Sequence, residues 1–117
     1  MTAKEYLEKT YVNSGEYRPP RKAVMCKDGF FISIQGGTDT HYCQPREYCN
    51  YYYELELGFP SQKDELIMQW AEDPKNPTQT VYGYVPIEAV EQLIEKHGGI
   101  VAVVIPMWQY LKSEVKP

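Results

Sequence analysis

Hydrophobic and polar residues alternate along several short stretches of the chain, which is the pattern of half-buried β-strands. The clearest case is residues 23–35, where two strand-like runs flank Asp28 and Gly29. This dipeptide is typical of a two-residue type I′ hairpin turn, which here pairs Lys27 with Phe30. In that register one apolar face carries Ala23, Met25, Phe30, Ile32 and Ile34. The sequence therefore predicts a β-hairpin over residues 23–35.

Three further stretches have the pattern of strands. Residues 51–58 alternate between apolar and acidic positions, which predicts a strand with one solvated face. Its expected inward-facing residues are Tyr53, Leu55, Leu57 and Phe59. Residues 80–86 predict a short strand, and the uninterrupted apolar run at 100–105 predicts a buried strand.

Helical signals mark both ends of the chain. Residues 3–9 predict a short helix. Residues 86–97 predict a longer helix, which ends at the glycine pair Gly98 and Gly99 because glycine favours the left-handed conformation that closes a helix. Residues 107–116 predict one or two final helical turns.

A further helix is expected over residues 61–72. Ser61 stands at the N-cap position and Asp64 at the capping-box position three residues later. The apolar side of this helix is expected to carry Leu66, Ile67, Trp70 and Ala71.

Together these elements predict a single α+β domain over residues 1–117. A small antiparallel sheet, built from the hairpin 23–35 and the strand 51–58, is expected to be covered by two or three helices. The helices expected on the sheet are 61–72 and 86–97. A chain of 117 residues is long enough to bury one hydrophobic core.

Charge and composition bear on the class of function. The net charge of −4 argues against long duplex DNA or RNA as a partner, because such binding depends on neutralising phosphates with Lys and Arg. No apolar run approaches the roughly 18 residues of a membrane span, so no membrane partner is expected. The charged N-terminal stretch lacks the apolar core of a signal peptide, and we expect a cytoplasmic protein. Its cysteines, Cys26, Cys43 and Cys49, are then expected to be free thiols.

Most of the chemically active side chains lie in the run SIQGGTDTHYCQPREYC, residues 33–49. A glycine pair allows backbone N–H groups to form an anion nest, and Arg46 offers a bidentate contact to a phosphate. Tyrosine rings stack on nucleic bases, a contact worth roughly 1–3 kcal/mol per base. The predicted ligand-binding residues are Gly36, Gly37, Thr38, Thr40, His41, Tyr42, Arg46 and Tyr48. The alternative is that this run is a wide loop that only connects two strands.

Metal binding and catalysis are less well supported by the same run. His41, Cys43 and Cys49 have the spacing H-x-C-x5-C, which lacks the closely spaced cysteine pair of structural zinc sites. Cys43 with His41 as its base is an enzyme hypothesis, but a nucleophile also needs an oriented base and an oxyanion pocket. We therefore expect no metal, no cofactor and no catalytic residue.

Four runs of the sequence have an order and spacing similar to those of small phage and prophage proteins. The runs span most of residues 25–100 and read MCKDGFFISIQ, HYCQPR, LELGFPS and TVYGYVPIEAVEQLIEKHGGI. Within that group the chain resembles the Thoeris anti-defence sponge family. Proteins of this family sequester cyclic ADP-ribose-type signals, and in some members cyclic oligonucleotides, in pockets at subunit interfaces without degrading them.

The resemblance implies a phage protein that acts in the cytoplasm of the infected host cell. The edges of the predicted sheet and the eleven tyrosines of the chain predict a homo-oligomer. The pyrophosphate of a nucleotide signal would meet Arg46 and either Arg18 or Arg21, and the adenine would stack on a tyrosine or on Trp108. The alternative function is a protein-binding inhibitor of a host defence effector, similar to anti-CRISPR factors. A basic surface of that effector would face the acidic residues Glu54, Glu56, Glu88, Glu91 and Glu95.

Overall fold

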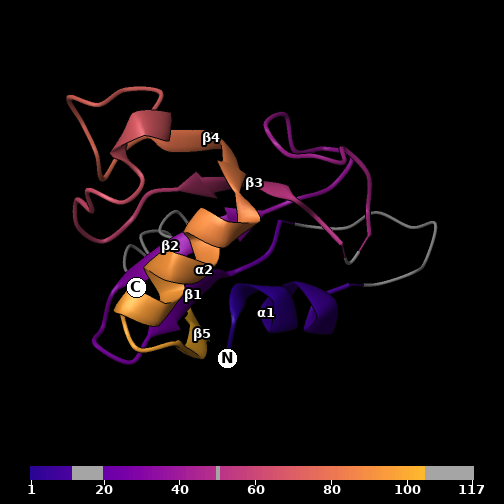
Figure 1. Ribbon diagram of the computed structural model, residues 1–117, viewed down its shortest axis with the longest axis horizontal. Coiled ribbons are helices and arrows are strands. Elements are labelled where there is room, and N and C mark those ends of the chain that lie inside the picture. The colour runs from indigo at the N-terminus through magenta and orange to yellow at the C-terminus, as the bar shows by residue number, and fades with distance from the viewer. Residues whose placement is uncertain (12–19, 50, 105–117) are drawn as a thin grey trace, which may run out of the picture.

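The centre of the protein is a five-stranded antiparallel sheet with the strand order β4-β3-β2-β1-β5 (Figure 1). The computed structural model describes residues 1–11, 20–49 and 51–104. The strands are β1 (Ala23–Cys26), β2 (Phe31–Gln35), β3 (Glu54–Gly58), β4 (Val81–Pro86) and β5 (Ile100–Val104). The helices are α1 (Ala3–Lys9), α2 (Ile87–Lys96) and the short 3₁₀ helix η1 (Met68–Trp70). This architecture agrees with the predicted α+β class.

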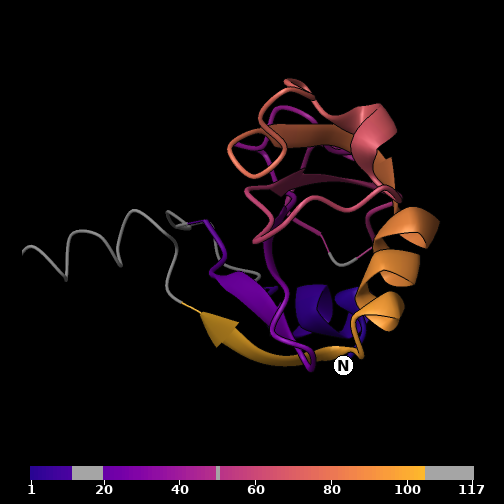
Figure 2. The same cartoon turned by 90° about the vertical axis from the view of Figure 1, so that its left-hand side faces the viewer.

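One hydrophobic core joins the sheet to both α-helices. In α2 the apolar stripe of Val90, Leu93 and Ile94 is buried, as the helical spacing predicts. α2 contacts β3 and β4, and α1 contacts α2 through a buried side that includes Tyr6 and Leu7 (Figure 2). The sheet contributes Val24, Cys26, Ile32, Ile34, Leu55, Leu57, Tyr82, Val85 and Ile100.

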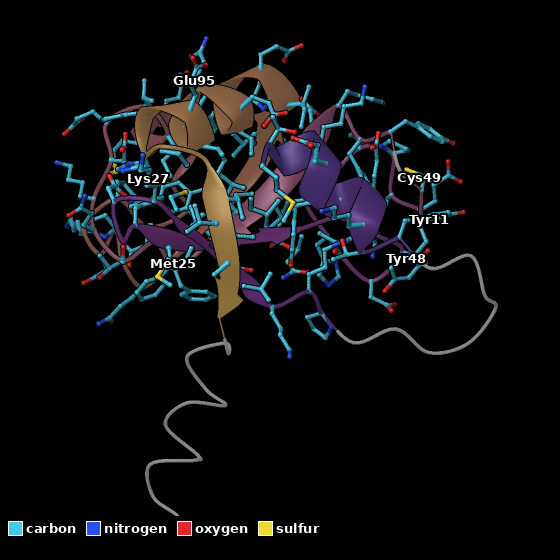
Figure 3. All side chains as sticks on the ribbon, turned by 90° about the horizontal axis from the view of Figure 1, so that it is seen from below. Tyr11, Met25, Lys27, Tyr48, Cys49 and Glu95 are labelled. Atoms are coloured by element: carbon cyan, nitrogen blue, oxygen red, sulfur yellow. The ribbon has the colours of Figure 1, made fainter. Side chains whose placement is uncertain are left out.

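The hairpin forms, but its predicted register is wrong by one residue. Val24 pairs with Ile32, so the loop contains three residues, Lys27 to Gly29. Only Gly29 has a positive φ, of 93°, whereas a type I′ turn needs two such residues. The slip places Val24 and Cys26 in the core and turns the half-buried Met25 to the opposite face (Figure 3).

The predicted helix over residues 61–72 does not form, and η1 is the helical turn found there. The Ser61 hydroxyl instead accepts a hydrogen bond from the Phe31 N–H (3.0 Å). The Asp64 carboxylate is bound by α2 and its C-cap, as described below. Ile67 is fully buried as expected, but Leu66 is exposed because the helical face to which it was assigned does not exist.

Two strands expose side chains that were expected to be buried. In and around β3, Leu55 and Leu57 are buried, whereas Tyr53 lies outside the strand and is exposed. Phe59 is exposed because its φ of 52° breaks the alternation immediately after the strand. The prediction of a buried strand at 100–105 is also wrong: β5 is an edge strand, with Val101 60% and Val103 49% exposed.

Several local signals are confirmed. α1 and α2 have nearly the predicted bounds, and α2 ends at glycines with φ of 94° and 89°. β4 falls where the strand at 80–86 was predicted. Within residues 1–11, 20–49 and 51–104, no helix is long and apolar enough to cross a membrane. The final helical turns predicted at 107–116 lie outside the described residues.

Candidate functional site

The Cys43 thiol is the centre around which the loop between β2 and β3 is organised. Its Sγ accepts from the Gly37 N–H (3.5 Å) and faces three carbonyl oxygens, those of Gly37, Thr40 and Pro45, at 3.4–3.7 Å. The side chain is fully buried, and this burial raises the pKa of the Cys43 thiol. A thiol in such surroundings is a poor nucleophile, because the reactive form is the thiolate.

The glycine pair at the start of this loop lies beneath two tyrosine rings. A Cβ on Gly36 would stand 2.8 Å from the Tyr52 ring, and a Cβ on Gly37 would stand 2.9 Å from the Tyr48 ring. Burial raises the pKa of Tyr52 to about 12, and its neutral hydroxyl donates to the Glu47 carbonyl (2.7 Å). Both glycines are buried, so the structure gives them a packing role. Their role as an anion nest stays a prediction.

Arg21 also has a structural role in the loop. Its Nη1 donates to the Gly36 carbonyl (2.7 Å), its Nε donates to the Thr10 hydroxyl (2.7 Å), and its guanidinium lies 5.9 Å from the centre of the Tyr52 ring. These contacts hold Arg21 against the inner side of the loop. The other predicted members Arg18 and Trp108 lie outside the described residues.

Arg46 and His41 come together at the surface. The Arg46 Nη2 lies 3.3 Å from the His41 Nδ1, and both side chains are exposed. In the part of the chain that the structure describes, no carboxylate forms an ion pair with Arg46. The Arg46 guanidinium can therefore donate to an anion, and the binding of an anion at this pair stays a prediction. Thr38, which precedes His41 by three residues, is exposed. Thr40 is half-buried, and its N–H donates to the Gly37 carbonyl (3.1 Å).

Next to this pair, the structure brings two tyrosines together from distant parts of the chain. The rings of Tyr42 and Tyr84 meet edge to face with centroids 5.7 Å apart, and the His41 ring lies 6.1 Å from that of Tyr42. Tyr84 donates from its N–H to the Tyr42 carbonyl (2.9 Å) and from its hydroxyl to the His41 carbonyl (3.3 Å). Tyr42 approaches β4 closely, because a Cβ on Gly83 would lie only 3.1 Å from the Tyr42 Cβ.

Tyr84 is the member of this cluster that the sequence prediction missed. Its φ is 54°, a left-handed conformation that costs a non-glycine residue free energy and persists only where the surrounding contacts enforce it. Its side chain is 41% exposed, so the ring is only partly buried. The available signal was Gly83, because a glycine inside a strand pattern often marks a bulge or a close backbone approach. We call His41, Tyr42, Arg46 and Tyr84 the surface cluster.

A second group of polar side chains lies at the C-terminal end of α2, around the buried His97 and Asp64. His97 Nδ1 lies 2.6 Å from Asp28 Oδ2, and His97 Nε2 lies 2.8 Å from Asp64 Oδ2. The Phe30 ring stacks on the imidazole with centroids 3.9 Å apart, and the Lys96 Nζ lies 3.1 Å from Asp64. Both ring nitrogens of His97 are engaged by carboxylates, so neither is available as a base. The arrangement ties the hairpin turn and the segment around Asp64 to α2.

Neither group is arranged as a metal site. Among the described residues, no group of three or more His, Cys, Asp and Glu side chains is arranged to hold a metal ion. Comparison with known proteins adds no assignment, since no family model, no curated protein and no solved structure matches the chain.

Proposed function

We propose that this protein binds a small anionic molecule that carries an aromatic ring, such as a cyclic nucleotide immune signal, and sequesters it without degrading it. In this proposal it is a phage anti-defence protein that acts in the cytoplasm of the host cell. The observation that carries the proposal is the surface cluster, in which an exposed guanidinium, a histidine and two tyrosine rings meet.

Each part of a nucleotide has a matching group in the surface cluster. Arg46 forms charge-assisted hydrogen bonds to phosphate oxygens, and His41 adds a second donor beside it. Tyr42 and Tyr84 offer aromatic faces and edges for stacking against a base. The resemblance to anti-defence sponges is an independent line of support, because those proteins hold ligands of this chemistry.

The chemistry of the described residues supports binding rather than turnover. The Cys43 thiol is buried and hydrogen-bonded within its loop, and His97 is held between two carboxylates. His41, which would be the base for Cys43 in the enzyme hypothesis, contacts Arg46 on the surface. We also propose a homo-oligomer. In the described part of the chain β5 is an edge strand that exposes Val101 and Val103, and an exposed edge strand favours pairing with another chain.

Exposed aromatic side chains favour a second candidate, a protein-binding inhibitor of a host effector. Tyr51, Tyr53 and Phe59 are each more than half exposed, and aromatic residues are enriched in protein interfaces. In this candidate the surface cluster would contact a protein instead of a metabolite.

Native mass spectrometry distinguishes the two candidates. The protein would be incubated with an extract from cells in which immune signalling has been activated, and then measured with and without heating. Sequestration predicts a stoichiometric small-molecule adduct that is released with unchanged mass after heating, and the same spectrum gives the number of subunits. A captured host protein without any small molecule would support the inhibitor instead, and a released molecule of altered mass would contradict both.

A further inference from the structure

Glu56 lies beside the aromatic part of the surface cluster. Its two neighbours in β3 pair with β4, Leu55 with Val85 and Leu57 with Tyr82. The register shifts between these pairs, so Glu56 faces the irregular step that contains Gly83 and Tyr84. Leu55 and Leu57 are both buried, and alternation along the strand directs the Glu56 side chain to the opposite face, where it is half-buried.

The Glu56 carboxylate has an electrostatic connection to the cluster but no hydrogen-bond donor among the described residues. Burial raises the pKa of Glu56, while a nearby charge on His41 opposes that rise and Glu72 adds to it. The residue of β2 that pairs with Glu56 is Gln35. The side-chain nitrogen of Gln35 donates to the Arg21 carbonyl and the Ser33 hydroxyl, and not to Glu56. Among the residues that the structure describes, none forms a hydrogen bond or ion pair with this carboxylate.

A half-buried carboxylate without a donor is costly, and beside an anion-binding pair it also repels the anion. A ligand that brings an N–H donor to this position removes the first cost, and the hydrogen bond offsets the remaining repulsion. A ligand that presents an acceptor there leaves the carboxylate unpaired, and sites that hydrogen-bond their ligand reject such analogues strongly.

We propose that Glu56 determines specificity by accepting a hydrogen bond from an amino group on the ligand's aromatic ring, while Arg46 and His41 hold the anionic group. This inference rests on the proposed function and narrows it to one ligand class, nucleotides whose base carries an exocyclic amine. Tyr42 and Tyr84 contact the ring without distinguishing bases, because stacking is tolerant of base identity.

The test uses two nucleotides that differ at this group, adenosine 5′-monophosphate with an amine and inosine 5′-monophosphate with a carbonyl. Their dissociation constants would be measured by isothermal titration calorimetry for the wild-type protein, Glu56→Gln and Glu54→Gln. We expect the wild-type protein to bind the adenine nucleotide at least about tenfold more tightly. Glu56→Gln should reduce this ratio below about threefold, because a carboxamide both donates and accepts. Glu54→Gln, on the same strand, is the matched control and should keep the ratio.

The outcomes separate this inference from the function on which it rests. Equal affinity of the wild-type protein for both nucleotides, or an unchanged ratio in Glu56→Gln, would overturn the role of Glu56 while leaving nucleotide binding in place. Failure of the wild-type protein to bind either nucleotide at millimolar concentration would overturn both. Circular dichroism of each variant checks that the fold is retained.

Discussion

His97 and Asp64 bind each other across the interior of the protein, with Nε2 and Oδ2 2.8 Å apart and both side chains at most 5% exposed. The sequence suggests a separate local role for each of them, His97 near the end of a helix and Asp64 at a helix N-terminus. The structure instead uses the pair to join α2 to the segment that follows β3. This contact explains why that segment is not the predicted α-helix, since Asp64 is held by a partner distant in sequence.

Asp64→Ala should therefore destabilise the protein by about 2–4 kcal/mol, since it leaves His97 and Lys96 without their shared carboxylate. The measurement is the free energy of unfolding from urea denaturation. The matched control is Glu65→Ala, which removes the adjacent carboxylate. This carboxylate is 80% exposed, and its ion-pair partner in the described part of the chain is the exposed Lys63. That change should stay within about 0.5 kcal/mol of wild type. Equal effects of the two substitutions would contradict the role given to Asp64.

The same carboxylate should make stability depend on pH in the acid range. Burial alone would raise the pKa of Asp64, but hydrogen bonds from the Leu66 N–H, His97 and Lys96 outweigh it and lower the pKa. A carboxyl with a lowered pKa in the folded state contributes stability that is complete above its unfolded value, about 3.9, and is lost as the pH falls through the folded value. Unfolding free energies measured from pH 6 down to about pH 2 should fall more steeply in wild type than in Asp64→Asn. Parallel curves would show that Asp64 does not contribute.

Gly36→Ala should destabilise the loop by about 1–3 kcal/mol, because the new methyl group would stand within 3 Å of a fixed ring. Tyr52 cannot move away easily, since its hydroxyl donates to Glu47 and accepts from the Cys49 N–H. Gly58→Ala is the control, because a Cβ there makes only ordinary contacts, the nearest at 3.6 Å. Thermal unfolding of both variants would compare them, and a smaller loss in Gly36→Ala than in Gly58→Ala would contradict the packing described.

Tyr84→Gly should separate binding from stability. Glycine adopts a φ of 54° without strain, which offsets the loss of the ring contact with Tyr42, so the unfolding free energy should change by less than about 1 kcal/mol. Ligand affinity should fall at least about tenfold, since one stacking surface is removed. Isothermal titration calorimetry and urea denaturation give the two values. Unchanged affinity would remove Tyr84 from the site.

Arg46→Ala should weaken the binding of an anionic ligand by more than about 1.5 kcal/mol, the loss of a charge-assisted hydrogen bond. Arg46→Lys should restore only part of it, because an ammonium group cannot make the bidentate contact. The affinity of wild type should also fall as salt concentration rises, and this dependence should be weaker in Arg46→Ala. Equal affinity of all three proteins would exclude Arg46 from the site.

The sequence predicts the fold well where an element is determined by interactions between residues that are close in sequence. The position of α2 and its closing glycines depend on residues within one or two turns, and both were found from the sequence. The dipeptide Asp28-Gly29 shows the limit of such signals. It suits a two-residue turn, but it equally suits a three-residue turn in which only glycine is left-handed, and the Asp28 carboxylate binds the distant His97.

The candidate site shows the same division. His41 and Arg46 are close in sequence, and a single loop brings them together, so the composition of that loop was enough to name both as candidates. Tyr84 and Glu56 come from β4 and β3, and only the irregular pairing of those strands places them next to the loop. Pairing between distant strands leaves at most a weak local signal, here Gly83, so neither residue was predicted as part of the ligand site.

The strand order has a consequence for how the chain reaches its native state. β5 pairs with β1 although the two strands lie far apart in the sequence. The paired residues run from Ala23 with Val104 to Cys26 with Ile100. Contacts between residues so far apart raise the contact order, and proteins dominated by them fold slowly. During synthesis, β1 and β2 leave the ribosome long before β5. The edge of β1 that pairs with β5 therefore stays unpaired until nearly all the described residues have been synthesised.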